Sequence, residues 1–356
     1  MLYSRVVPTV TLVAGIALTA APVSAEEFRL RIGSGHSPSW HFIQLAREYF
    51  IPEVQRRVAE ETEHTVTFVE GWSGSMVQVT EVLQAVETGV LDIGMYCICH
   101  EAQRLALNNF PMYLPFGPND PAVSSQVTRA VYDAHPELGG QFERYGQRLL
   151  GLVPFEPYNI VARSAISEAR EVQGLRIGAA GPNAFWVESA GALPVSVGGP
   201  DMYTSFQTGL IDGMVIFLSV MESLKLFEVA PNFIDVSFGS MTVTALTINE
   251  NRLNRLPEDV RNIILEVGSD MEAHSGPFTR DLVEQTMAGV ESQGVNVVRV
   301  SDEERAAWAE MLQAASVRVG QRYAEETGLP VLAVMQTYLD AAEAAGHSWP
   351  ARPALD

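Results

Sequence analysis

The chain has 356 residues and a formal net charge of −20, and it contains no low-complexity run. A chain this acidic is repelled by nucleic acid and by anionic membrane surfaces, so neither is expected as a partner. Its length is greater than a single hydrophobic core usually serves, which favours two lobes.

The first 25 residues have the layout of a secretory signal peptide. Arg5 supplies a positive charge, Val6–Ala20 is almost entirely apolar or small, and Ala21–Ala25 provides small residues before an acidic pair. The apolar run is shorter than the ~20 residues that cross a bilayer, and no later stretch approaches that length. We expect cleavage near Ala25 and an exported protein that does not span the membrane. An uncleaved N-terminal anchor is the alternative.

The first half of the mature chain alternates strands with amphipathic helices. Phe28, Leu30 and Ile32 share one face of a strand, and Gly89 provides a helix C-cap. The predicted elements are a strand at 28–32, a helix at 41–60 that Pro52 kinks or ends, a strand at 66–69, a helix at 79–86 and a strand at 91–98. This order predicts a mainly parallel sheet covered by helices.

A second set of elements begins near Gly174. We predict strands at 175–177, 195–197 and 210–216, with helices at 183–190 and 203–208. The segment 207–212 (QTGLID) repeats the pattern of 87–92 (ETGVLD): a helix end, a glycine, two aliphatic residues and an aspartate entering a strand. One supersecondary unit in each half is what two similar lobes predict.

The remaining elements return to both halves. Strands are predicted at 242–248 and 295–300, a helix follows Pro257, and Ser301 with Glu304 forms a capping box for another helix. We therefore expect lobe I to comprise 26–152 plus about 243–290, and lobe II 153–242 plus about 291–356. Hinges are expected near 151–158 and 239–243.

Cys97 and Cys99 are the only cysteines, and they precede His100. Two cysteines spaced i, i+2 on one face of a strand form a badly strained bridge, so we expect no structural disulfide. A metal site needs more ligands than this cluster offers. We expect packed or lining thiols and neither a metal nor a cofactor.

No enzyme signature is present. The sequence lacks the nucleophile elbow, the zinc-protease motif, the Walker loop and the dinucleotide fingerprint. The loops at 33–35 and 71–75 could meet an anion at a helix N-terminus, but tight turns are the simpler interpretation. An exported enzyme whose catalytic groups meet only in space remains an alternative.

The ordered set of motifs resembles the solute-binding proteins of TRAP transporters. It comprises Phe28–Ile32, the helix at 41–60, 71–76, the helix ending at Gly89, and 109–116 (NFPMYLPF) in the first half. In the second half 172–177 (VQGLRI), 191–195 (GALPV) and 203–213 (YTSFQTGLIDG) resemble the family's "KGLKIR", "GAxPV" and "EVYxALQxGVVDG" segments, and 256–260 (LPEDV) resembles its later "LPEDVQ" segment. The resemblance covers nearly the whole mature chain and implies a two-lobed α/β fold of the periplasmic binding protein type, with a ligand cleft and a hinge.

The chain departs from the family at one important position. The resemblance implies an arginine after "GLKI" that pairs with a solute carboxylate, a task suited to guanidinium. Gly178 occupies that position here. Arg163 and Arg176 are the candidates to replace it, and a direct count places Tyr158 near a second ligand-region arginine of the relatives.

Other candidate ligand-binding residues occupy loops and strand ends that line the cleft in relatives: Trp40, His41, Trp72, Tyr96, Tyr158, Asn159, Asn183, Trp186 and Phe217. Aromatic side chains suit a ring or a cationic group. The alternative for each is a packing role between the lobes. We expect Trp40 and Trp72 in the first lobe, and Tyr158 and Trp186 in the second, to form the walls.

The expected function is capture of a small organic acid for ion-gradient-driven uptake, with TRAP membrane subunits as partners. Because of Gly178, an aromatic, neutral or cationic solute is an alternative. A second alternative is an exported sensory binding protein. Genes for transporter membrane subunits beside the gene of this protein would argue against the sensory role.

Overall fold

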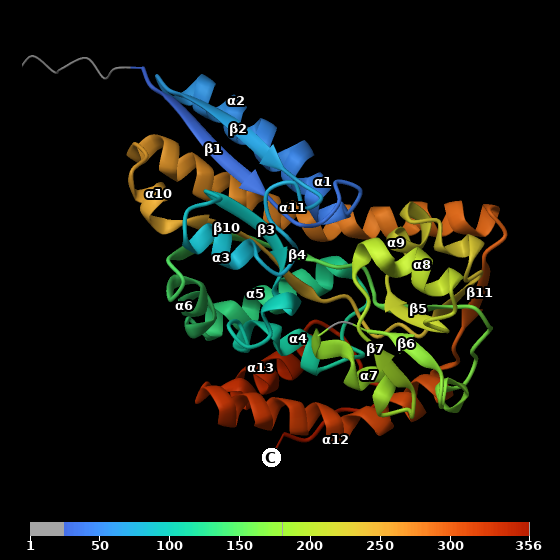
Figure 1. Ribbon diagram of the computed structural model, residues 1–356. Coiled ribbons are helices and arrows are strands. Elements are labelled where there is room, and N and C mark those ends of the chain that lie inside the picture. The colour runs from blue at the N-terminus through green and yellow to red at the C-terminus, as the bar shows by residue number, and fades with distance from the viewer. Residues whose placement is uncertain (1–24, 180, 356) are drawn as a thin grey trace, which may run out of the picture.

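The computed structural model describes residues 25–179 and 181–355. Apart from Ala25, the expected signal peptide lies outside the described residues. The described chain folds into two α/β lobes, each built on one sheet, with a long helix running along both (Figure 1). The predicted two-lobed α/β fold is confirmed.

The sheet of lobe I has the order β2-β1-β3-β10-β4. Its strands are β1 (Glu27–Gly33), β2 (Thr65–Gly71), β3 (Ile93–Cys97), β4 (Gln147–Pro154) and β10 (Thr242–Asn249). β1, β2 and β3 are parallel, whereas β10 is antiparallel to both β3 and β4. The carboxyl ends of β1, β2, β3 and β4 therefore lie at one edge of the sheet.

The sheet of lobe II has the order β11-β9-β5-β8-β6-β7. Its strands are β5 (Asn159–Ala162), β6 (Arg176–Gly178), β7 (Leu193–Val195), β8 (Gly213–Ile216), β9 (Asn232–Asp235) and β11 (Asn296–Arg299). β5 is antiparallel to both β8 and β9. The first residue of β5 therefore lies beside the carboxyl end of β8, and its last residue lies at the opposite edge.

Helices cover both sheets (Figure 1). They are α1 (His41–Leu45), α2 (Ile51–Glu61), α3 (Val82–Glu87), α4 (Phe110–Tyr113), α5 (Pro121–Ala134), α6 (Glu137–Glu143), α7 (Phe185–Glu188), α8 (Met202–Gln207), α9 (Leu218–Ser223), α10 (Glu250–Asn254), α11 (Glu258–Ser292), α12 (Asp302–Thr327) and α13 (Val331–Ala344). A π-helical turn at Ala46–Phe50 joins α1 to α2, and Pro52 lies in the first turn of α2, where a missing N–H is tolerated. As predicted, the Ser301 hydroxyl accepts from the Glu304 N–H at the start of α12.

The repeated six-residue pattern forms the same unit in both lobes. Gly89 and Gly209 adopt φ of +73° and +71° after α3 and α8. Asp92 accepts hydrogen bonds from the backbone N–H and guanidinium of Arg31, at 2.7 and 3.0 Å. Asp212 binds Arg176 in the same way, at 3.0 and 2.8 Å. In each lobe the aspartate that directly precedes one strand thus binds an arginine of the neighbouring parallel strand.

In the described part of the chain, three connections join the sheets. The segment 155–158 leads from β4 to β5, the segment 236–241 leads from β9 to β10, and α11 leads from β10 towards β11. The first two leave one sheet and enter the other at the edges where the carboxyl ends lie, so these edges face each other. The expected hinge segments, near 151–158 and 239–243, overlap the two short connections.

Candidate functional site

Aromatic side chains fill the space between the facing edges. The inter-lobe aromatic cluster consists of Trp40, His41, Phe42, Phe155, Tyr158, Trp186 and Phe217, linked by ring contacts with centroids 4.9–6.3 Å apart. Phe155 and Phe217 stack at 4.9 Å, and Tyr158 meets Phe217 edge-on at 5.2 Å. Both geometries are favourable for aromatic pairs. The cluster takes residues from α1 and the position before it, from the 155–158 connection, from α7 and from the position after β8, and so holds the two lobes together.

Trp40 is the cluster member that is both partly exposed and in contact with the other lobe. It lies immediately before α1, and its ring meets Phe217 of lobe II at 5.6 Å and His36 of lobe I at 4.9 Å. A Cβ atom on Gly199 of lobe II would lie 3.9 Å from Cζ2 of Trp40. Trp40 therefore lies at the boundary between the two lobes with part of its surface exposed.

Trp186 has a different environment from the expected wall. Its side chain is 0% exposed, and its indole N–H donates to the Met112 carbonyl at 3.0 Å. The indole N–H of Trp308 donates in turn to the Trp186 carbonyl at 3.1 Å. These bonds tie α7 to α4 and α12, so Trp186 is part of the packed interior in this conformation.

Tyr96 and Trp72 lie outside the cluster. Tyr96 is the penultimate residue of β3, is 1% exposed, and its hydroxyl donates to Gln147 Oε1 at 3.2 Å. Burial raises the pKa of Tyr96 well above its usual value, so the phenol stays neutral. Trp72 follows β2 and donates to the Glu70 carboxylate at 2.6 Å.

Asn159 and Asn183 are both buried near the facing edges. The Asn159 carbonyl oxygen accepts from the Ser237 N–H at 2.7 Å, and its amide donates to the Pro157 carbonyl at 3.2 Å. Asn159 therefore ties the two short connections between the lobes to each other. Asn183 ends a short 3₁₀ turn at Gly181–Asn183.

The two arginines expected to replace the family arginine lie at the opposite edge of lobe II. Arg163 follows β5, is exposed, and its N–H donates to the Asp212 carbonyl at 3.0 Å. Arg176 begins β6 and is paired with Asp212. The antiparallel direction of β5 and the position of Arg176 at the start of β6 put both guanidinium groups far from the cluster. The prediction that either contacts a solute between the lobes is not supported by this geometry.

Gly178 does lie at the facing edge, as the last residue of β6. It is paired with Met214 of β8, and a Cβ atom there would lie 3.0 Å from Met214 Cγ. The methionine side chain thus covers the face of the strand where a larger residue would begin. At this position the site offers an apolar surface in place of a guanidinium group.

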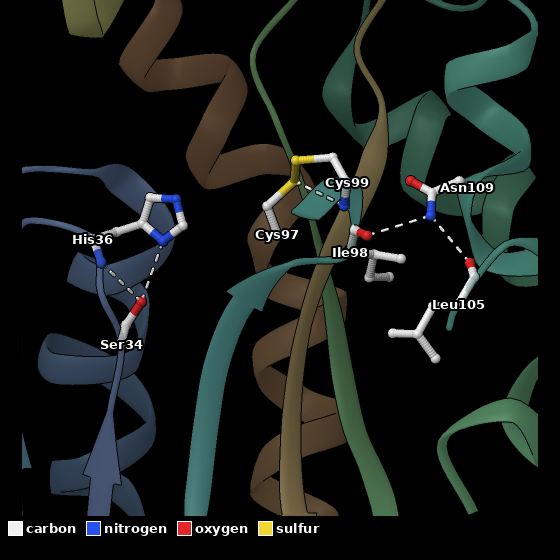
Figure 2. The surroundings of a disulfide bond; sticks show 7 residues. All are labelled: Ser34, His36, Cys97, Ile98, Cys99, Leu105 and Asn109. Atoms are coloured by element: carbon white, nitrogen blue, oxygen red, sulfur yellow. Dashed lines mark hydrogen bonds between the residues drawn. A yellow bond between two sulfur atoms is a disulfide. The ribbon is translucent and has the colours of Figure 1, made fainter. Parts of the chain in front are cut away.

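The expectation for the cysteines was wrong, because Cys97 and Cys99 form a disulfide (Figure 2). The strand ends at Cys97 and a 3₁₀ turn starts at Ile98, so the two Cα atoms are 5.2 Å apart. A continued strand would separate them by about 6.6 Å and point them along one face. A disulfide sulfur is not a thiolate, so the cluster with His100 lacks the form of cysteine that binds metals.

The disulfide lies at the facing edge of lobe I. Figure 2 shows His36 directed towards it from the loop after β1, where Ser34 Oγ and His36 Nδ1 are 3.3 Å apart. The rings of His36 and His100 are 5.6 Å apart. Burial lowers the pKa of His36 to about 3 and that of His100 to about 4, so both are neutral at pH 7.

A cavity of about 290 Å³ lies beside α8, away from the disulfide. Its lining includes Ser196, Thr204, Ser205 and Thr208.

Sequence reasoning missed a buried acid in the first connection. Glu156 is 1% exposed and accepts from the backbone N–H of Ser219 at 3.1 Å and from its hydroxyl. His41 Nδ1 lies 3.7 Å from Glu156 Oε1. A lone glutamate between aromatic residues in 154–158 (PFEPY) was the available signal.

A family model described as bacterial extracellular solute-binding protein, family 7, matches residues 48–321. The chain belongs to this family. Its members are solute-binding receptors rather than enzymes, and they act outside the cytoplasm. None of the helices in the described ranges is long and apolar enough to span a membrane.

Relatives of known structure share the fold of this family 7 protein. The ectoine-binding periplasmic protein TeaA of Halomonas elongata is 22% identical over 330 residues, which cover 87% of this chain and 92% of TeaA. A TRAP solute-binding protein of Rhodoferax ferrireducens with copurified benzoate has a TM-score of 0.77 at 17% identity, covering 89% of this chain and 98% of that one. A Bordetella pertussis receptor that binds pyroglutamic acid has a TM-score of 0.73 at 20% identity, covering 88% of this chain and 99% of that one. The recognition of a TRAP-type solute receptor is therefore confirmed.

Proposed function

We propose that this protein captures a small cyclic organic solute between its lobes in the periplasm and delivers it to TRAP membrane subunits. The observation that carries the proposal is the inter-lobe aromatic cluster, in which Trp40 of lobe I meets Phe217 of lobe II at 5.6 Å. Ligands of open α/β sheets bind at the carboxyl ends of the strands, where this cluster lies. Cleavage near Ala25 and the lobe boundaries given above belong to the same proposal.

The chemical environment favours a ring over a simple carboxylate. Gly178 offers no guanidinium group, and Arg163 and Arg176 lie at the far edge of lobe II. Flat aromatic surfaces suit cyclic molecules and cations. The relatives named above are associated with ectoine, benzoate and pyroglutamic acid, which all contain a ring. An acyclic organic acid is the second candidate, because benzoate and pyroglutamic acid both carry a carboxylate group.

Mass spectrometry of ligand released from freshly purified protein would identify the solute. Calorimetry would then measure the affinity of the protein for that molecule and for benzoate, pyroglutamate and ectoine. Removing a central aromatic anchor typically weakens binding by about 2 kcal/mol, or about thirtyfold. We expect Trp40→Ala to lose at least that much affinity and Arg163→Ala, altered at the far edge, to bind like the wild type.

The opposite pattern would contradict the proposal. If Trp40→Ala binds like the wild type while Arg163→Ala does not, the solute is held by charge and away from the cluster. Gly178→Arg tests the second candidate, because it restores a guanidinium group at the facing edge. We expect it to improve binding of an acyclic acid such as succinate and to leave the cyclic solute no better bound.

A further inference from the structure

Two buried ionisable groups face each other where the lobes are connected. His41 and Glu156 are each 1% exposed, and the rings of Phe42, Phe155 and Phe217 surround His41 at centroid distances of 5.7–6.3 Å. The pair is almost completely buried in this conformation. Its protonation is therefore decided by its immediate neighbours.

The hydrogen bonds of His41 fix which of its nitrogens carries a proton. Nε2 lies 2.9 Å from the Pro154 carbonyl oxygen, which can only accept, so Nε2 carries the hydrogen. In the neutral ring Nδ1 then carries no hydrogen and presents a lone pair. Nδ1 is buried and has no hydrogen-bond partner among the described residues. A buried polar atom in this state normally costs about 1–3 kcal/mol.

The atom that Nδ1 faces is also an acceptor. Glu156 Oε1 lies 3.7 Å away, and the two carboxylate oxygens already accept from the hydroxyl and the backbone N–H of Ser219. A lone pair facing an ionised carboxylate in a medium of low dielectric constant is unfavourable. One added proton turns this repulsion into a hydrogen bond, with only a small approach of the two groups.

The environment places that proton on the glutamate. Burial raises the pKa of Glu156 to about 7, against the lowering effect of the bonds from Ser219. Burial lowers the pKa of His41 to about 4, although its bond to Pro154 acts in the opposite direction. Among the described residues, two further titratable groups lie near the pair. Glu222 on α9 carries a charge that also raises the pKa of Glu156, and burial keeps Tyr158 on the connection neutral.

The pair joins elements of both lobes. His41 belongs to α1 of lobe I, Glu156 to the 155–158 connection, and Ser219 to the first turn of α9 in lobe II. We propose that Glu156 and His41 share one proton at this connection and that release of the proton favours separation of the lobes. The inference does not depend on which solute the protein binds.

The proton can be followed by NMR of the wild-type protein labelled with ¹⁵N-histidine between pH 6 and pH 9. We expect a neutral His41 ring throughout, with the hydrogen on Nε2 and an Nδ1 shift that changes with a midpoint near pH 7. In Glu156→Gln the amide can donate to Nδ1 permanently, so the shift should not depend on pH. An imidazolium ring at pH 6, or an Nδ1 shift that is constant in the wild type, would overturn the proposal.

Separation of the lobes can be followed by small-angle X-ray scattering of solute-free protein. The radius of gyration should be larger at pH 9 than at pH 6 in the wild type and equal at both in Glu156→Gln. Glu222→Gln is the matched control, because it removes one negative charge and leaves the pair intact. It should keep the transition and move its midpoint to lower pH. An equal change in Glu156→Gln and the wild type would refute the coupling to lobe separation.

Discussion

Replacing Trp186 with alanine should destabilise the whole protein rather than weaken solute binding alone. The indole is 0% exposed and packs against Tyr158 at 5.4 Å and Phe238 at 5.3 Å. Truncation of a buried tryptophan to alanine costs about 3–5 kcal/mol, and the Met112 carbonyl left without its donor adds about 1–3 kcal/mol. We expect a loss of at least about 4 kcal/mol, a large part of the 5–15 kcal/mol typical of a folded protein.

Equilibrium unfolding in urea, followed by circular dichroism, measures this loss. Trp186→Phe is the informative companion, because it keeps an aromatic ring and removes only the indole N–H and part of the volume. It should lose less, about 1–3 kcal/mol. The reasoning fails if Trp186→Ala loses under 2 kcal/mol and yet no longer binds solute, since Trp186 would then be a wall of the binding site.

Two further predictions concern stability. Reduction of Cys97–Cys99 should lower the unfolding free energy by only about 1.6 kcal/mol, because the bridge closes a loop of about three residues. Urea unfolding measures this loss, and a Cys97→Ala/Cys99→Ala variant treated with the same reductant is the control. A loss above 3 kcal/mol in the wild type alone would contradict the prediction. Stability should also fall between pH 6.5 and 4. Burial depresses the pKa of His36 to about 3 and of His100 to about 4, so the unfolded chain binds protons there that the folded chain does not. Two such protons give a slope of up to about 2.7 kcal/mol per pH unit near pH 5, and a urea midpoint unchanged from pH 7 to pH 5 would rule it out.

Local sequence patterns were enough to predict the alternation of strands and helices. Hydrophobic periodicity and capping signals act within a few residues, so they located β1, α3, the start of α12 and the repeated unit ending at Asp92 and Asp212. The ordered motifs were enough to predict the family. The local signals did not predict several elements between residues 110 and 162, among them α5 and β4.

The direction of one strand decided which candidate site residues meet. Asn159 and Arg163 are four residues apart, yet the antiparallel pairing of β5 with β8 puts Asn159 at the facing edge and Arg163 at the far edge. Sequence spacing does not give the direction in which a strand joins a sheet. Only the sheet topology therefore shows that Arg163 lies away from the inter-lobe aromatic cluster.

Contacts between distant segments settled the remaining roles. The sequence determined that the chain has the signal-peptide pattern, the two α/β halves and the aromatic residues of a TRAP-type receptor. Only the tertiary structure placed Trp186 in the interior, turned the chain after Cys97 so that the disulfide forms, and brought His41 to within 3.7 Å of Glu156. Burial and pairing depend on partners more than 70 residues away, as for Trp186 and Met112, and local propensity carries no information about such partners.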